Sequence, residues 1–131
     1  MEVHIANVCS APVKMGKVSS IVRKVLKGEA KETGGVNVVF CDDRKMLELN
    51  RRFRQISKPT DILSFPFDDS DLLGEIYISI ETAIRQAKEI GHSVEMEIKR
   101  LLVHGTVHLL GHDHKEKKER EQMEAIEAKY L

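Results

Sequence analysis

The segment from Leu101 to Leu110 is almost entirely apolar, and it restricts the fold of this chain more than any other part of the sequence. Gly111 follows it directly, at the kind of position where a helix commonly ends. A helix that is apolar on nearly all sides has to be covered by other elements, so this one is predicted to be buried. Two histidines, His104 and His108, interrupt the apolar residues. Buried imidazoles need partners, because a polar group without one is unfavourable in an apolar environment.

The rest of the chain alternates between strand-like and helix-like segments. Strands are predicted at residues 2–8, 36–41, 60–67 and 73–80, where apolar residues alternate or run continuously. Helices are predicted at residues 17–27, 81–90, 93–110 and 115–130, the last with Met123, Ile126 and Tyr130 facing inward. A further helix is expected after the capping pair Asp42-Asp43, with an apolar stripe of Met46, Leu49 and Phe53. Glycines are expected to end three helices, at Gly34-Gly35, Gly91 and Gly111.

The connections between these segments indicate the fold class. Strands 60–67 and 73–80 flank the turn residues 68–71 and are expected to pair as a hairpin. The order β-α-β-α-β-β-α-α-α predicts an α+β fold, with a mixed sheet of about four strands and helices packed on it. The chain of 131 residues contains no repeat or linker, so we expect a single domain over residues 1–131.

Composition restricts the cellular compartment and the classes of partner that are expected. Lysine and arginine number 21, as do aspartate and glutamate, so the global basic excess of many nucleic-acid binders is absent. No apolar run approaches the roughly 20 residues that span a bilayer, and the first residues lack a signal-peptide pattern. Two cysteines, Cys9 and Cys41, are too few for a disulfide framework. We therefore expect a cytoplasmic protein.

Four of the six histidines lie between residues 104 and 114, in the order His-Gly-Thr-Val-His-Leu-Leu-Gly-His-Asp-His. His104 and His108 are four residues apart, so they share one face of the helix and can point at one ion. Gly111 permits a left-handed turn that brings His112 or His114 back to the same ion. Three histidines with an open fourth position are typical of catalytic zinc, whereas structural zinc sites are usually closed by four protein ligands. A lone histidine here would be read as a core residue, but the whole combination favours a metal site.

One residue argues against a peptidase. In zinc proteases with a His-Glu-x-x-His helix, the glutamate after the first histidine is the general base. That position is Gly105 in this chain, so a standard peptidase mechanism lacks its base.

The histidine segment and two earlier segments resemble the motifs of a known family. The histidine segment is similar to the HGxLHLxGxDH signature of the YbeY family of single-zinc endoribonucleases, also called rRNA maturation factors. Residues 49–54 and 58–66 read LNRRFR and KPTDILSFP, and together they resemble the family's LNxxyR…kpTDVLSFP segment. Residues 73–76, LGEI, resemble the family's LGDI with glutamate in place of aspartate. The motifs occur in the family's order between about residues 45 and 115.

The resemblance implies that His104, His108 and His114 hold one zinc ion per chain and that Arg54 is catalytic. It selects His114 over His112, because the family often has tyrosine at the position of His112. It also implies a single-strand-specific endoribonuclease that matures ribosomal RNA, notably the 3′ end of 16S rRNA, and acts in ribosome quality control. The expected partners are ribosomal RNA and the small ribosomal subunit, and a monomer is the default oligomeric state.

Arg54 is expected to clamp a phosphate, because a guanidinium matches phosphate geometry with two parallel hydrogen bonds. Basic residues surround it in the sequence and predict a local patch that can follow an RNA backbone despite the neutral total: Arg51, Arg52 and Lys58. Ser64 is expected either to hydrogen-bond within a strand or to line the cleft. Phe65 is expected in the core rather than as a platform for a base.

The general base is left open among three acidic residues, Asp113, Asp61 and Glu75. Asp113 could instead orient the second ring nitrogen of a ligand histidine. Asp61 and Thr60 fit a turn or a cap equally well.

Two other functions fit the same residues. One is a metal-dependent peptidase or amidase, which the glycine at position 105 disfavours. The other is a zinc-stabilised, non-catalytic ribosome-assembly module, which would unfold when the metal is removed. Nickel, copper and iron also suit three histidines, so the donor set alone does not choose zinc.

Overall fold

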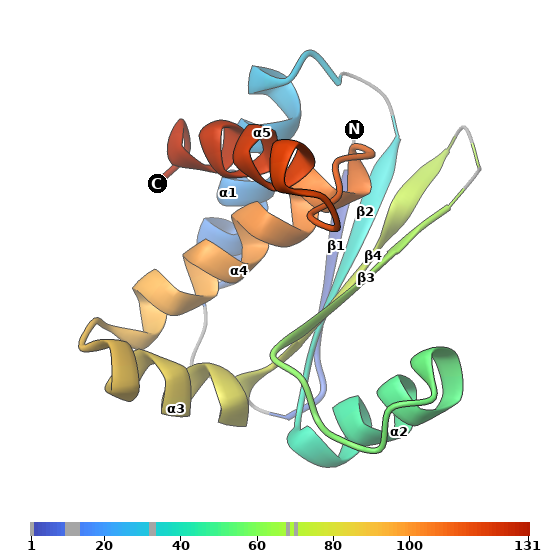
Figure 1. Cartoon of the computed structure of the whole chain (residues 1–131), viewed down its shortest axis with the longest axis vertical. Coiled ribbons are helices and arrows are strands. Elements are labelled where there is room, and N and C mark those ends of the chain that lie inside the picture. The colour runs from blue at the N-terminus through green and yellow to red at the C-terminus, as the bar shows by residue number, and fades with distance from the viewer. Residues whose placement is uncertain (1, 10–13, 32–33, 68, 70) are drawn as a thin grey trace.

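A mixed sheet forms the centre of the computed structural model, which describes residues 2–9, 14–31, 34–67, 69 and 71–131 (Figure 1). The strand order is β1-β2-β4-β3, so β3 lies at an edge. β1 and β4 both pair with β2 in parallel, and β3 pairs with β4 antiparallel as the predicted hairpin. The predicted mixed sheet of about four strands is thus confirmed. The strands are β1 Glu2–Asn7, β2 Gly35–Cys41, β3 Ile62–Pro66 and β4 Leu72–Ser79.

The helices cover the two faces of this sheet unequally. α1, α4 and α5 lie on one side, with α3 near the lower end of α4, whereas α2 lies on the opposite side near one end of the strands (Figure 1). Much of the face that carries α2 therefore has no helix over it. The helices are α1 Met15–Gly28, α2 Asp43–Arg54, α3 Ile80–Ile90, α4 Val94–Leu109 and α5 Lys117–Ala128.

The core follows from this arrangement. The largest buried cluster joins α1 and α4 to the sheet through residues such as Val22, Phe40, Ile76 and Leu101. A second cluster under α5 contains Met123 and Tyr130, and a third lies between α2 and the sheet. Most of the apolar segment 101–110 is buried, as predicted. α4 contacts the strands β3 and β4 and the helices α1, α3 and α5.

Most predicted helix ends are confirmed by their hydrogen bonds. The side chain of Asp42 accepts from the backbone N–H of Lys45, and that of Ser93 accepts from Met96, so both residues cap their helices. Gly91 and Gly111 adopt left-handed conformations with φ of 88° and 99° directly beyond α3 and α4. Within the described ranges, no helix is long and apolar enough to cross a membrane.

Two predictions about helices were wrong in detail. α1 ends at Gly28 rather than at Gly34-Gly35, because the chain turns at Ala30, whose φ is 59°, and Lys31 N–H bonds to Leu26 C=O. Gly35 instead begins β2. In α2, Met46 and Leu49 are buried, but 54% of Phe53 is exposed because it lies on the last turn, where its ring meets the edge of the Phe65 ring.

Candidate active site

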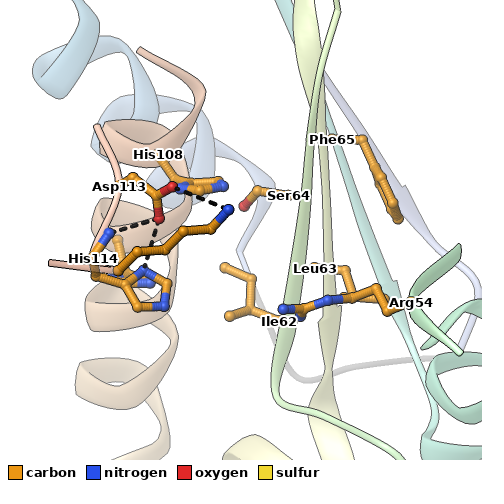
Figure 2. A pocket seen from close by; sticks show the side chains of 10 residues that line it. Arg54, Ile62, Leu63, Ser64, Phe65, His108, Asp113 and His114 are labelled. Carbon is orange, nitrogen blue, oxygen red and sulfur yellow. Dashed lines mark hydrogen bonds and ion pairs between the residues drawn. The ribbon is translucent and has the colours of Figure 1, made fainter. Parts of the chain in front are cut away.

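One cleft gathers residues from four separate segments of the chain. Its volume is about 460 Å³, and Figure 2 shows its two sides. Arg54 from the end of α2 points in from one side, the histidines and Asp113 lie on the other, and β3 runs between them (Figure 2). The lining residues are Arg54, Ile62, Leu63, Ser64, Phe65, His104, His108, Asp113, His114 and Lys115.

His104 and His108 lie on consecutive turns of α4, both half-buried. Each ring is held through its Nδ1 atom. The Nδ1 of His104 is 2.5 Å from Oε1 of Glu127 in α5, and the Nδ1 of His108 is 2.9 Å from the backbone oxygen of His112. Such partners fix the ring orientation and the tautomer, which is how ligand histidines are usually held in metal sites. Among the described residues, the Nε2 atom of each ring has no hydrogen-bond partner, so it is the nitrogen available to a ligand.

The turn after α4 brings His114 back to these two rings. Gly111 adopts its left-handed conformation there and its N–H bonds to the carbonyl of His108. The ring centroid of His114 is then 5.8 Å from that of His104 and 6.3 Å from that of His108. His114 lines the cleft, whereas His112 contributes its carbonyl to the orientation of His108.

Asp113 adds a carboxylate to this group. Ligand atoms of His108, Asp113 and His114 lie within 4.8 Å of one another, close enough to hold a metal ion. Its Oδ1 accepts the backbone N–H of His114 at 2.7 Å, and Lys115 Nζ lies 4.0 Å from Oδ2. The hydrogen bond from that N–H, opposed by slight desolvation and aided by Lys115, lowers the pKa of Asp113. The carboxylate is therefore ionised at neutral pH.

The electrostatics favour a neutral imidazole at His108. Burial lowers its pKa, and the neighbouring rings of His104 and His114 lower it further. The carbonyl of His112 and the carboxylate of Asp113 act in the opposite direction, but the net shift is downward. Because only the neutral imidazole offers a lone pair, this environment suits a metal ligand.

Arg54 is exposed at the C-terminal end of α2, and the next residue, Gln55, is left-handed with φ of 54°. The side-chain amide of Asn50 donates to the carbonyl of Lys58 at 2.8 Å, which fastens the loop after α2 to the helix. The predicted basic neighbours Arg51, Arg52 and Lys58 are also exposed.

Two of the three candidate bases lie outside the cleft. Asp61 accepts hydrogen bonds from Gln86 and Thr60, and its carbonyl accepts from Ser79, so it fastens the start of β3 to its neighbours. Glu75 accepts hydrogen bonds from Asn37 and Tyr77 on β2 and β4. Of the three, only Asp113 lines the cleft.

Close packing around Gly105 leaves no room there for the glutamate that serves as the base in zinc proteases. A Cβ atom at this position would lie 2.8 Å from Cδ1 of Ile62 and 3.1 Å from Oγ of Ser64. α4 therefore packs directly on β3 here, and no side chain at position 105 could extend into the cleft without separating them. Ser64 takes part in this contact and also lines the cleft.

Glu127 is the residue of the site that the sequence interpretation missed. It lies four residues after Met123, which is fully buried against α1 and α4. Residues four apart share a helix face, so its inward position follows from the predicted inward face of the last helix.

Comparisons with known proteins identify the relatives of this chain. A family model described as endoribonuclease YbeY matches residues 4–131. A relative of that name from Aquifex aeolicus is 50% identical over 91 residues, 66% of this chain and 61% of that protein. Another, from Acholeplasma laidlawii, is 42% identical over 113 residues, 85% of this chain and 82% of that protein. The solution structure of a Thermotoga maritima protein matches with a TM-score of 0.73 and 29% identity, covering 98% of this chain and 85% of that one.

The match spans both motifs and nearly every described element, with a relative that is 42% identical over most of its own length. The chain therefore belongs to the endoribonuclease YbeY family.

Proposed function

We propose that this protein is a zinc-dependent, single-strand-specific endoribonuclease that matures ribosomal RNA in the cytoplasm, including the 3′ end of 16S rRNA, and takes part in ribosome quality control. The observation that carries the proposal is the single cleft shared by Arg54 and the three histidines. Family membership supports the enzyme class, and the named relatives are endoribonucleases.

The residues present fit a catalytic metal ion better than a structural one. His104 and His108 keep their Nε2 atoms available while Nδ1 is engaged, and His114 lies next to both rings. Neither Cys9 nor Cys41 lines the cleft, whereas structural zinc sites are usually closed by cysteines. We propose that these three histidines hold the ion, with the Asp113 carboxylate beside it. A zinc ion held there would act as a Lewis acid toward the phosphate.

Arg54 has the chemistry to bind the phosphodiester. Its guanidinium can donate two parallel hydrogen bonds to phosphate oxygens. Its position across β3 from the histidines lets the scissile phosphate lie between them (Figure 2). A fixed cation at this point stabilises the negative charge that grows on the phosphate during cleavage.

Asp113 is the acidic residue best placed to handle a proton. Its ionised carboxylate lines the cleft beside His108 and His114. We propose that it orients a water molecule for attack on the phosphorus and accepts its proton, while the P–O bond to the leaving ribose oxygen breaks and that oxygen is protonated from solvent. Ser64, which packs against Gly105 of α4, offers a hydroxyl to the same cleft.

The experiment compares His108→Ala, Arg54→Ala and a control, Arg23→Ala, whose exposed arginine lies on α1 outside the cleft. Metal content is measured on the purified proteins, and cleavage is measured on single-stranded and duplex ribosomal RNA segments. We expect His108→Ala to lose both metal and cleavage. Arg54→Ala should keep the metal and cleave at least about 100-fold more slowly, as expected when one charge-stabilising donor is lost. Arg23→Ala should behave as wild type, and a metal-loaded Arg54→Ala protein that cleaves at the full rate would refute the role of Arg54.

A further inference from the structure

An aromatic row extends from the cleft onto the sheet face that α2 leaves uncovered. Phe65 lines the cleft next to Arg54, and its ring meets Phe53 at 5.3 Å and Tyr77 at 5.8 Å, both edge to face. Phe65 and Tyr77 are half-buried, whereas 54% of Phe53 is exposed. The three rings come from β3, α2 and β4, so the fold assembles them although they are distant in the sequence. Phe65, expected in the core, is half-buried and packs against the buried cluster between α2 and the sheet.

Hydrogen-bonding groups lie directly beside the row. Phe65 is paired across the strands with Glu75, and Glu75 is paired with Asn37 of β2. The Asn37 amide donates to Oε2 of Glu75 at 3.2 Å, and the Tyr77 hydroxyl lies 3.5 Å from Oε1. Beside a stacked base, such side chains can hydrogen-bond to the edge of the base: the carboxylate accepts from base amino groups, and the amide can both donate and accept.

The charge around the row is positive at Phe53. Three arginines occupy the last turn of α2, and the guanidinium of Arg52 lies 5.5 Å from the centre of the Phe53 ring. The chain as a whole is neutral, with 21 basic and 21 acidic residues, so this concentration is local. Aromatic rings flanked by arginines combine stacking with backbone neutralisation, as in surfaces that bind single-stranded nucleic acid.

We propose that Phe53, Phe65 and Tyr77 form a platform on which bases of a single-stranded RNA stack, next to the phosphate held by Arg54. The proposal rests on the endoribonuclease function proposed above. It accounts for single-strand specificity physically, because the bases of a duplex are stacked inside it and are unavailable to aromatic side chains. The platform is continuous with the cleft through Phe65. The arginines in the last turn of α2, beside the platform, complement the charge of an RNA phosphate backbone better than an apolar protein segment.

Binding of a fluorescent single-stranded oligoribonucleotide, measured by anisotropy in EDTA so that cleavage is blocked, tests the platform. The variants are Phe53→Ala, which removes a mostly exposed ring, and Phe65→Leu, which keeps apolar volume on β3. The control is Ile90→Ala, since Ile90, at the end of α3, is exposed to a similar degree (59%, against 54% for Phe53). Each oligonucleotide is used intact and with abasic sites at successive positions. Thermal unfolding checks that every variant is folded.

We expect Phe53→Ala and Phe65→Leu to bind the intact strand roughly tenfold more weakly, with Ile90→Ala unchanged. At the stacked positions, an abasic site should weaken binding to wild type but add little to the loss in the variants. The salt dependence should be unchanged in both, because no cation is removed. Equal binding by wild type and both variants, or an equal loss with the abasic strand, would overturn the platform.

Cleavage assays separate this result from the proposed function. If wild type cleaves RNA, Arg54→Ala does not, and the phenylalanine variants bind as wild type, the platform is wrong and the endoribonuclease function stands. If wild type neither binds nor cleaves single-stranded RNA, the proposed function fails and the platform fails with it.

Discussion

The contact between Gly105 and β3 makes a quantitative prediction about stability. In Gly105→Ala, the added methyl group would lie 2.8 Å from Cδ1 of Ile62, 3.1 Å from Oγ of Ser64 and 3.2 Å from Cγ2 of Ile76. The end of the Ile62 side chain can move aside. Ile76 is fully buried, and Ser64 has a short side chain on a hydrogen-bonded strand, so these two contacts have to be relieved by a shift of α4.

Two effects of opposite sign decide the outcome. Inserting a methyl group into a packed interior costs about 1–3 kcal/mol. Replacing glycine by alanine within a helix favours folding by up to about 1 kcal/mol. We therefore expect Gly105→Ala to lower the free energy of unfolding by about 1 kcal/mol, which corresponds to a fall in Tm of roughly 4 °C for a chain of this size.

The control is Gly16→Ala, because Gly16 lies in α1 and an added Cβ would meet nothing within 4 Å. It should gain stability from helix propensity alone. Both variants are unfolded in urea with EDTA present, since bound metal would change the apparent stability. The difference between them isolates the packing effect. If Gly105→Ala is as stable as Gly16→Ala, α4 and β3 are not in the close contact described.

Three further predictions concern the site and the polar interior. Glu127→Ala should weaken metal binding by about 10- to 100-fold in a chelator competition, because the ring of His104 loses its orienting partner, whereas Glu124→Ala on the exposed side of α5 should not. The hydrogen bonds of Arg100 are the largest cause that lowers the pKa of the fully buried Glu97 to about 2. The contribution of ionised Glu97 to the free energy of unfolding is therefore fully present above the ordinary pKa of 4.5 and is lost as the pH falls from there toward 2. That loss should be about 3 kcal/mol by urea titration and should be largely absent in Glu97→Gln, which is less stable at pH 7. Chelator should lower Tm but leave the circular dichroism spectrum intact at 25 °C, and unfolding by chelator at that temperature would instead support a structural metal.

Local sequence patterns predicted most of the helices and strands, because side-chain periodicity, turn residues and helix caps act between residues close together in the sequence. The buried strand 36–41, the hairpin and the caps at Asp42 and Ser93 are all within a few residues of their predicted positions. α1 ends one residue beyond the predicted Lys27, but the pair expected to stop it, Gly34-Gly35, lies outside the helix, and Gly35 begins β2. Gly28 is a close-approach residue, since a Cβ there would collide with the Tyr130 ring, which comes from the other end of the chain.

The site was predictable only in part. His104, His108 and the turn at Gly111 lie in one short segment, so their proximity follows from helix geometry. Arg54 joins them from about fifty residues earlier, and only the resemblance placed it in the site. The position of Glu75 away from the cleft depends on which way β4 faces, and that is fixed by its pairing with β2 and β3 rather than by its own sequence.

The edge position of β3 explains how groups from opposite faces of the sheet reach one cleft. Side chains alternate along a strand, so Ile62 and Ser64 face α4 while Leu63 and Phe65 face α2 and the uncovered side. An interior strand would separate these faces, because its neighbours would continue the sheet on both sides. At an edge the cleft can pass around the strand, so Arg54 and Phe65 on one face meet His104 and His108 on the other. A shift of β3 by one residue would exchange Ser64 and Phe65 between the faces and disrupt both halves of the site, which makes the register between β3 and β4 the structural basis of the proposed activity.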